Sequence, residues 1–423
     1  MSTPLSSQGI ASTITDDADP LPKSTSSIYK TPYIKRGTPA FMRVTLALFS
    51  AGLATFALLY CVQPILPILS QDFGISPATS SLSLSVSTVT LAVGLLFTGP
   101  ISDSVGRKNV MVVSLLLAAF CTLVCSFMTT WQSVLIMRAL LGLSLSGVAA
   151  VAMSYLSEEI HPSVIAFSMG LYISGNSIGG MSGRLITGVL TDFFPWRVAI
   201  FVLGIVALFA ALAFWRMLPE SRHFRAGSLK PKTLWINARL HWRDAGLPLL
   251  FLEGFLLMGS FVTLFNYIGY RLLDAPYYMN QAVVALLSVV YLTGSYSSPR
   301  AGAMTAKYGR GRVLAGAVLL MLTGLILTLF SPLVLVFAGM MLFAAGFFAS
   351  HSVASSWIGQ RAHRAKGQAS SMYLFFYYLG SSLAGTTGGF FWYQFGWPGV
   401  VGFLVALLLL AFYISFRLKA LQR

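Results

Sequence analysis

Four ionisable side chains fall inside long apolar stretches of this sequence, and their chemistry needs explaining first. Glu253 and His351 could each take up and release a proton, while Arg138 and Arg184 could hold an anion or a backbone carbonyl. Ionisable groups are rare inside a bilayer, where they mark functional sites or tightly bonded braces. No metal-ligand cluster and no nucleophile beside a base is evident, so the sequence predicts binding and proton exchange and not an enzyme.

The composition places these residues in a membrane protein. The chain has 423 residues, of which 56% are hydrophobic and only 9% charged, whereas about 25% of a soluble domain is charged. A helix needs about 20 apolar residues to cross the hydrocarbon core. Twelve runs qualify, at roughly 44–69, 78–102, 109–128, 132–156, 164–190, 197–217, 247–272, 281–303, 312–330, 333–357, 369–391 and 397–417. The predicted fold is an all-α membrane protein of twelve transmembrane helices.

The second half of the chain echoes the first. GPISDSVGRKNV at 99–110 aligns with GAMTAKYGRGRV at 302–313, and GNSIGGMSG at 175–183 aligns with GSSLAGTTG at 380–388. Two related halves predict a site between them, at the pseudo-twofold axis. The predicted organisation is a disordered cytoplasmic tail (1–42), a six-helix bundle (43–217), a basic cytoplasmic loop (218–246) and a second six-helix bundle (247–423).

The positive charge follows from membrane topology. Of the 28 Lys and Arg residues, 24 fall in connections on one side, so the positive-inside rule places that side and both termini in the cytoplasm. The net charge of +16 therefore indicates no nucleic-acid partner. Part of the loop 218–246 is expected to lie on the inner leaflet, with Leu234, Trp235 and Ile236 facing lipid. The three cysteines lie in apolar runs, which favours neither a disulfide framework nor a zinc site.

A loop motif after the second run carries a family resemblance. It reads Gly99-x-x-x-Asp103-x-x-Gly106-Arg107-Lys108. Glycine allows two helices to approach closely, and Arg107 can pair with Asp103. The motif resembles that of the major facilitator superfamily, and the similarity covers nearly all of 40–420. In that family the cluster latches the two halves together on the cytoplasmic side when the cavity opens outward. The second copy has Ala306 in place of the aspartate, which predicts a weaker latch there.

Two further motifs extend the resemblance to the drug/proton antiporter and arabinose-efflux-like branch. Arg138-Ala-Leu-Leu-Gly142, in the fourth run, resembles a motif with an intramembrane arginine. Three roles are open for this arginine: it could aid proton coupling, contact an anionic substrate, or brace the fourth span against the first. The fifth run carries a glycine stripe for close packing. It comprises Gly175, Gly179 and Gly183, with Gly180 alongside. It resembles the antiporter-associated motif, which implies export, but has Asn176 where that motif has proline.

The seventh run predicts a cavity wall. At 100° per residue one helix face collects Glu253, Leu257, Ser260, Leu264, Tyr267 and Arg271. In the family, spans 1, 4, 7 and 10 line the cavity, so Glu253 could approach His351, either to carry protons or in a static hydrogen bond. Further cavity candidates are Tyr60 and Gln63, which lie beside Pro64 and Pro67, two prolines expected to kink the first run. Tyr377 is another, with its neighbours Tyr373 and Tyr378. The last is Arg184, which could pair with Asp192.

These features predict a secondary transporter that exports a small organic molecule by alternating access in exchange for protons. No Walker-type phosphate loop occurs, so we expect an ion gradient to drive it without a cofactor. The alternatives are uptake or exchange of an organic anion, suggested by the two intramembrane arginines, and, from another class, a receptor that binds without transport. The resemblance implies a monomer in a bacterial inner membrane.

Overall fold

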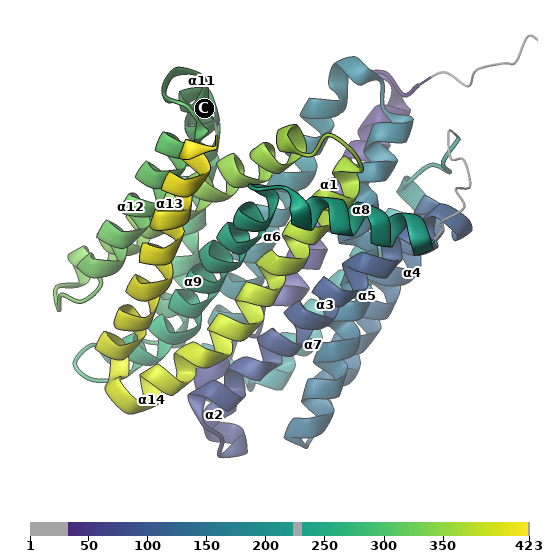
Figure 1. Ribbon diagram of the computed structural model, residues 1–423. Helices are drawn as coiled ribbons and strands as arrows, with labels where there is room; N and C mark the ends of the chain where they lie inside the picture. The colour runs from purple at the N-terminus through teal and green to yellow at the C-terminus, as the bar shows by residue number, and fades with distance from the viewer. Residues whose placement is uncertain (1–32, 223–230, 422–423) are drawn as a thin grey trace, which may run out of the picture. The chain divides into compact units, whose positions relative to one another are not determined.

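The computed structural model describes residues 33–222 and 231–421, and these are nearly all helical. The first half contains α1 (Pro39–Tyr60), α2 (Leu66–Phe73), α3 (Pro77–Val105), α4 (Arg107–Cys125), α5 (Trp131–Glu159), η1 (Pro162–Val164), α6 (Ile165–Phe193) and α7 (Trp196–Met217). After α8 (Pro231–Arg243), the second half contains α9 (Leu247–Leu273), α10 (Gln281–Leu286), η2 (Leu287–Leu292), α11 (Thr293–Tyr308), α12 (Arg310–Leu327), α13 (Leu333–Arg361) and α14 (Lys366–Ala420) (Figure 1).

The predicted twelve-helix fold is confirmed. Ten helical stretches are long and apolar enough to cross a bilayer. One of them, the 55-residue α14, is interrupted by non-helical backbone at Gly396 and so supplies two crossings. The remaining crossing is α6, which is as long as α3, at 29 residues, but contains more glycine.

Proline and an N-cap set the limits of the first crossing. Thr38 accepts a hydrogen bond from the Phe41 N–H at 3.2 Å, so α1 begins at Pro39, inside the segment predicted as a tail. The predicted tail residues 1–32 lie outside the described residues. The run predicted to end at 69 breaks after Tyr60, and α2 begins at Leu66, which brackets Pro64.

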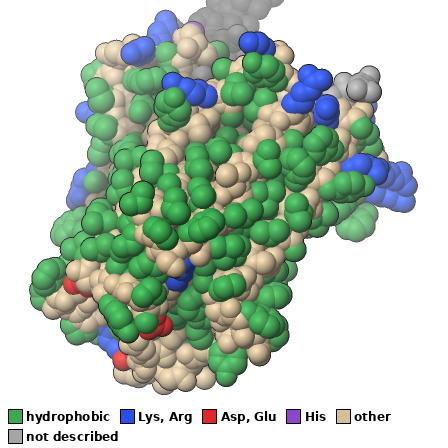
Figure 2. Space-filling model, turned by 90° about the vertical axis from the view of Figure 1, so that its left-hand side faces the viewer, with side chains coloured by type: hydrophobic (Ala, Val, Ile, Leu, Met, Phe, Trp, Pro, Cys, Tyr) green, Lys and Arg blue, Asp and Glu red, His purple; other side chains and the backbone are tan. Residues whose placement is uncertain are grey.

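The connection between the halves contains α8, which Figure 1 shows running crosswise to the long helices. Trp235 is 72% exposed and Ile236 is also exposed, as expected for side chains that face lipid at the membrane surface. The Leu234 side chain and residues 223–230 lie outside the described set. On the face shown in Figure 2, hydrophobic side chains cover most of the middle and Lys and Arg side chains gather at the upper end.

The two halves repeat each other in backbone detail. Gly106 and Gly309, at matching positions of the repeated loop, both have positive φ, of 103° and 80°. A Cβ on Gly175 of α6 would meet a backbone carbonyl of α1, and one on Gly380 of α14 would meet a backbone carbonyl of α9. Each glycine stripe therefore lets the first helix of its half pack directly against the fifth.

Candidate functional site

A buried arginine at the junction of the two halves is the centre of the candidate site. The Nε of Arg184 donates to the Gln63 Oε1 at 2.6 Å, and its Nη1 donates to the Gly180 carbonyl on the same helix. The guanidinium carbon lies 4.4 Å from the centroid of the Tyr60 ring and 4.7 Å from that of Tyr291. The cation is therefore clamped between one aromatic ring from each half, an arrangement that stabilises positive charge.

The predicted pairing of Arg184 with Asp192 is wrong. Asp192 instead accepts hydrogen bonds from the backbone N–H groups of Gln281 (2.9 Å) and Ala282 (3.0 Å). The physical reason is that Asp192 lies about 12 Å further along α6, where the N-terminus of α10 presents unpaired N–H groups to a carboxylate. No carboxylate pairs with Arg184 among the residues that the structure describes.

Gln63 extends this network across the junction. Its Nε2 donates to the Asn266 Oδ1 at 2.7 Å and to the Val262 carbonyl at 3.3 Å, both on α9. A chain of hydrogen bonds thus runs from Arg184 in α6, through the segment after α1, to the second half. Gln63 was predicted as a cavity residue, and the structure places it as the polar link between the halves.

Arg138 is held as a brace. Its Nε donates to the Ser83 carbonyl at 2.8 Å, and its Nη1 and Nη2 donate to the carbonyls of Leu58 (2.9 Å) and Leu59 (2.6 Å). All three nitrogens are thereby occupied by backbone oxygens of α3 and α1. This geometry favours the bracing interpretation over a role in proton coupling.

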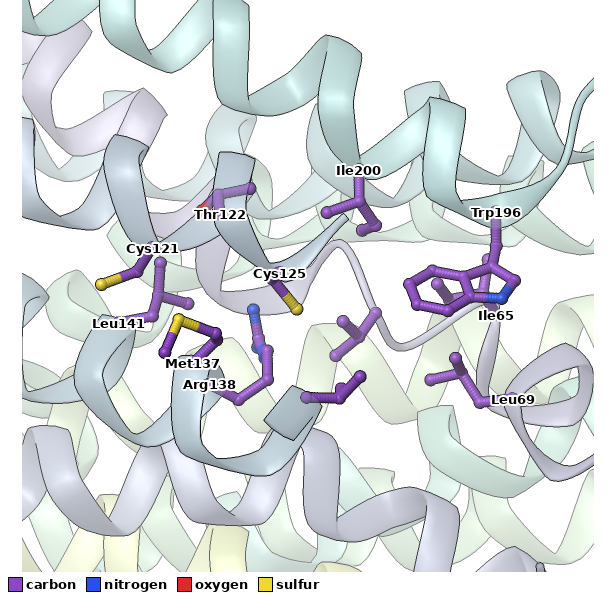
Figure 3. Close-up of a pocket in the computed structure, with 12 residues that line it drawn as sticks. Ile65, Leu69, Cys121, Thr122, Cys125, Met137, Arg138, Leu141, Trp196 and Ile200 are labelled. Carbon is purple, nitrogen blue, oxygen red and sulfur yellow. The ribbon is translucent and has the colours of Figure 1, made fainter. Parts of the chain in front are cut away.

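A small pocket adjoins Arg138 on the inside of the first half (Figure 3). Its lining is otherwise mainly apolar and includes Cys121, Cys125 and Trp196. The three cysteines of the chain are free and buried, and Arg138 already points its guanidinium at backbone carbonyls. This pocket is therefore a packing defect beside the brace and offers no convergent polar groups to a ligand.

Glu253 is fully buried in the first two turns of α9, so it faces protein and not lipid. Neither of its carboxylate oxygens has a hydrogen-bond partner among the described residues. The next residue, Gly254, lies against the ring of Tyr373, and the Glu253 carboxylate is within electrostatic range of that side chain.

The predicted static hydrogen bond between Glu253 and His351 is wrong. The Nδ1 of His351 lies 2.9 Å from the Tyr373 hydroxyl, and its ring centroid is 4.7 Å from that of Tyr377. The reason is that α14 brings its tyrosines to both groups, so Tyr373 takes the hydrogen bond that the carboxylate was expected to make. Tyr377 joins this cluster as an aromatic wall.

The structure does not single out the predicted cavity face of α9, because almost every side of this helix is buried. Tyr267 donates to the Gly385 carbonyl at 2.7 Å and its ring lies against Gly388, so α14 encloses it and it lines no cavity. Ser260 is buried and its hydroxyl has no partner among the described residues. Ser260 thus remains a candidate, and Tyr267 is a packing residue.

The latch residues form ion pairs with residues of the first half or of the connection directly after it. Arg107 pairs with Asp103 at 2.5 Å and with Glu158 at 2.7 Å, and Lys108 pairs with Glu220 at 2.9 Å. None of these pairs reaches the second half. The close helix approach expected at Gly99 is also not made, since a Cβ there would have no neighbour within 4 Å. The reason is that the halves are joined at the opposite ends of their helices.

Hydrogen bonds between the halves show where they are joined. The Tyr270 hydroxyl lies 2.7 Å from the hydroxyls of both Ser70 and Ser80. Ser85 and Ser382 each donate to the other's carbonyl, at 3.1 and 2.8 Å. These residues all lie between mid-helix and the side opposite the basic loops. The described structure is therefore closed on that side.

In the second copy of the latch, a neutral amide replaces the acid. Arg310 donates to Gln360, where Arg107 of the first copy meets a glutamate. The adjacent Arg361 pairs with Asp244 at 2.5 Å. Burial would raise the pKa of the Asp244 carboxyl, but hydrogen bonds from Arg361 and from the backbone N–H groups that begin α9 outweigh it. They hold the pKa below its ordinary value.

Sequence reasoning missed Tyr291 and Asn266. Both sit in apolar runs without a recognisable motif, and only the packing of η2 and α9 against the first half brings them to Arg184 and Gln63. The one local signal was polarity, since Asn266 interrupts the apolar run LLMGSFVTLFNYIGY.

The comparisons with known proteins agree on one family. A family model described as Major Facilitator Superfamily matches residues 48–296. The inner membrane transport protein YnfM of Escherichia coli (strain K12) is 68% identical over 386 residues, which cover 91% of this chain and 93% of that protein. The uncharacterized MFS-type transporter YybF of Bacillus subtilis (strain 168) is 44% identical over 90% of this chain and 95% of its own.

Solved structures show the same fold at low sequence identity. A bacterial homologue of the human lysosomal transporter Spinster, in an inward-facing and unoccupied conformation, superposes with a TM-score of 0.73 at 15% identity, covering 90% of this chain and 98% of that one. The nucleoside transporter NupG gives a TM-score of 0.72 at 13% identity, covering 89% and 99%. This likeness concerns the fold alone.

Proposed function

The chain belongs to the major facilitator superfamily, and from this premise we propose that it exports a small organic molecule by alternating access in exchange for protons. It is a multi-pass transporter of the bacterial inner membrane and not an enzyme. Proton coupling, export, a monomeric state and operation without a cofactor are the parts that we propose.

Glu253 is the observation that carries the coupling proposal. A carboxylate that is ionised and buried without a cationic or hydrogen-bonding partner is destabilised by several kcal/mol. Both Glu253 oxygens are in that position among the described residues. Its protonation should therefore change when water reaches it, which is what a proton carrier in an alternating-access cycle requires.

The neighbouring aromatic pair supports a proton path. The Tyr373 hydroxyl is hydrogen-bonded to His351, and the Tyr373 ring packs against Gly254, the residue next to Glu253. The hydroxyl and the imidazole can both donate and accept a proton. We assign Glu253 the carrying role and His351 and Tyr373 a role in passing the proton.

The positive-inside rule assigns the two ends of the helices to the two sides of the membrane. It places the basic loops, the latch residues and both termini in the cytoplasm. The hydrogen bonds between Ser85 and Ser382 then lie toward the periplasm. On this assignment the structure is the inward-facing state, in which the latch is released between the halves.

Proteoliposomes test the coupling. A substrate is first found by a thermal-shift screen of metabolites and toxic compounds at two pH values. Glu253→Gln should then still exchange labelled substrate across the membrane but should no longer accumulate it against a gradient when a pH difference is imposed. Asp274→Asn is the control, because Asp274 is an exposed acid outside the latch and the buried clusters. Gradient-driven accumulation by Glu253→Gln at the parent's rate contradicts the proposal.

A second candidate, uptake or exchange of an organic anion, is favoured by Arg184. That guanidinium has no carboxylate partner in the described structure, whereas Arg138 is occupied by backbone carbonyls. Counterflow that proceeds at the same rate with and without a pH difference, and is lost in Arg184→Gln, would support exchange over proton-coupled export.

A further inference from the structure

We propose that Arg184, together with the hydroxyls of Tyr60 and Tyr291, binds the carboxylate of a monovalent organic acid with an aromatic or similarly apolar body. This inference rests on the chain being a transporter, and it names the class of its substrate. It does not depend on the direction of transport or on the proton carrier.

The hydrogen-bonding capacity of Arg184 is only partly used. A guanidinium has five N–H donors. In the described structure, the Nε hydrogen is directed to Gln63 and one Nη1 hydrogen to Gly180. The Nη2 hydrogens have no acceptor there. Arginine presents such hydrogens in a planar fork that matches the two oxygens of a carboxylate.

The charge at this position is also uncompensated. Arg107 meets Asp103 and Arg361 meets Asp244, whereas the more exposed Arg310 meets the neutral Gln360. Arg138 has no acid among the described residues, but each of its three nitrogens donates to a backbone carbonyl. Arg184 is 4% exposed and has only one amide oxygen, one carbonyl and two aromatic faces. A single negative charge would balance it, which sets the ligand as monovalent.

Two buried hydroxyls surround the cation without partners. The Tyr60 and Tyr291 rings lie on the guanidinium, and both side chains are more than nine-tenths buried. Neither hydroxyl has a hydrogen-bond partner among the described residues. A buried phenol normally has one. A carboxylate bound at Arg184 would supply the acceptor that both hydroxyls lack, because a hydroxyl hydrogen can rotate about its C–O bond toward a partner.

The surroundings favour an apolar body for the ligand. Tyr291 lies in an aromatic cluster, with ring centroids 5.1 Å from Phe261 and 5.0 Å from Phe265. Phe261 in turn stacks on Phe347 at 3.9 Å. Aromatic and aliphatic ligand groups pack favourably against such rings.

The position of the site also suits a transport cycle. Tyr60 and Arg184 belong to the first half, while Tyr291 lies in the second, on the short 3₁₀ segment η2 between α10 and α11. A 3₁₀ stretch inside a longer helix often marks a hinge. Movement of one half against the other would separate Tyr291 from the cation, so ligand binding and the conformational change act on the same contacts.

Binding to the purified full-length protein tests the proposal. The probes are benzoate, hexanoate and lactate, with benzamide and benzylamine as the neutral and cationic counterparts of benzoate. We expect benzoate or hexanoate to raise the melting temperature by mass action, and benzamide and benzylamine to leave it unchanged. If none of the three carboxylates binds, or if benzamide binds as well as benzoate, the proposal is overturned.

Variants locate the binding. Arg184→Gln should weaken carboxylate binding at least about tenfold. Since that protein could fail to fold, Tyr60→Phe and Tyr291→Phe, which keep the ring on the cation, should each weaken binding about fivefold. Tyr393→Phe is the control, because Tyr393 is 72% exposed. Unchanged affinity in both Tyr60→Phe and Tyr291→Phe overturns the assignment. Carboxylate binding is measured on the purified protein without a pH difference, whereas proton coupling is measured in proteoliposomes, so failure of proton coupling is distinguished from failure of this site.

Discussion

Close packing of α6 on α1 can be tested at one glycine. A Cβ added at Gly179 would come within 2.7 Å of the Leu53 Cα and 2.8 Å of the Leu53 carbonyl carbon. Backbone atoms cannot rotate away as a side chain can, so the two helices must separate. Overpacking of this kind destabilises by about 1–3 kcal/mol. The clash involves backbone, which places Gly179→Ala toward the upper end, at about 2–3 kcal/mol.

The same helix supplies the control. Gly170 has nothing within 4 Å of an added Cβ, so Gly170→Ala should be neutral or stabilising by up to about 1 kcal/mol, because alanine favours helix. Thermal unfolding of both purified variants in one detergent measures the difference. The packing argument is refuted if Gly179→Ala melts at the same temperature as Gly170→Ala.

Three further results are expected. Arg138→Lys should destabilise by about 3 kcal/mol in thermal unfolding, since backbone carbonyls lose donors, yet leave carboxylate affinity within about threefold; a large loss of affinity would contradict the bracing role. Asp244→Asn should lose about 1 kcal/mol at pH 7. Because the pKa of Asp244 is depressed in the folded state, this difference should shrink once pH falls below the ordinary pKa of an aspartate and vanish below the depressed folded value; a constant difference would contradict it. Asp192→Ala removes the α6 carboxylate that accepts from the first two N–H groups of α10, a contact worth about 1 kcal/mol. It should raise maleimide labelling of a cysteine placed at Ser85 in a cysteine-free background about fivefold, whereas unchanged labelling would show that this contact does not hold the halves together.

Much of the fold could be predicted because its determinants are local. Apolar runs of about 20 residues specify crossings in a bilayer. The repeated GRK and GRG loops indicated two related halves, and the structure has positive φ at both Gly106 and Gly309. The exact limits of the helices could be predicted less well. α1 stops at Tyr60 because prolines follow, and the last two crossings follow each other with only the non-helical backbone of Gly396 between them.

The site depended on contacts that no local pattern encodes. The sequence singled out Arg184 and Gln63, but their partners lie on helices from different parts of the chain. Asp192 was paired with Arg184 because the two have opposite charge and are close in sequence. The N–H groups that Asp192 accepts from begin α10, in the other half of the chain, and only the packing of the two halves brings them to it. For the same reason His351 was matched to Glu253 when Tyr373 is its partner.

The central claim is that substrate and protons move in opposite directions through this protein. The most direct measurement is the internal pH of sealed proteoliposomes, followed with a trapped dye while a substrate identified by thermal shift is added outside. Wild-type protein should move protons only when substrate is present, and Glu253→Gln should move substrate without protons. Substrate transport by the wild type with no accompanying change of internal pH would contradict the account.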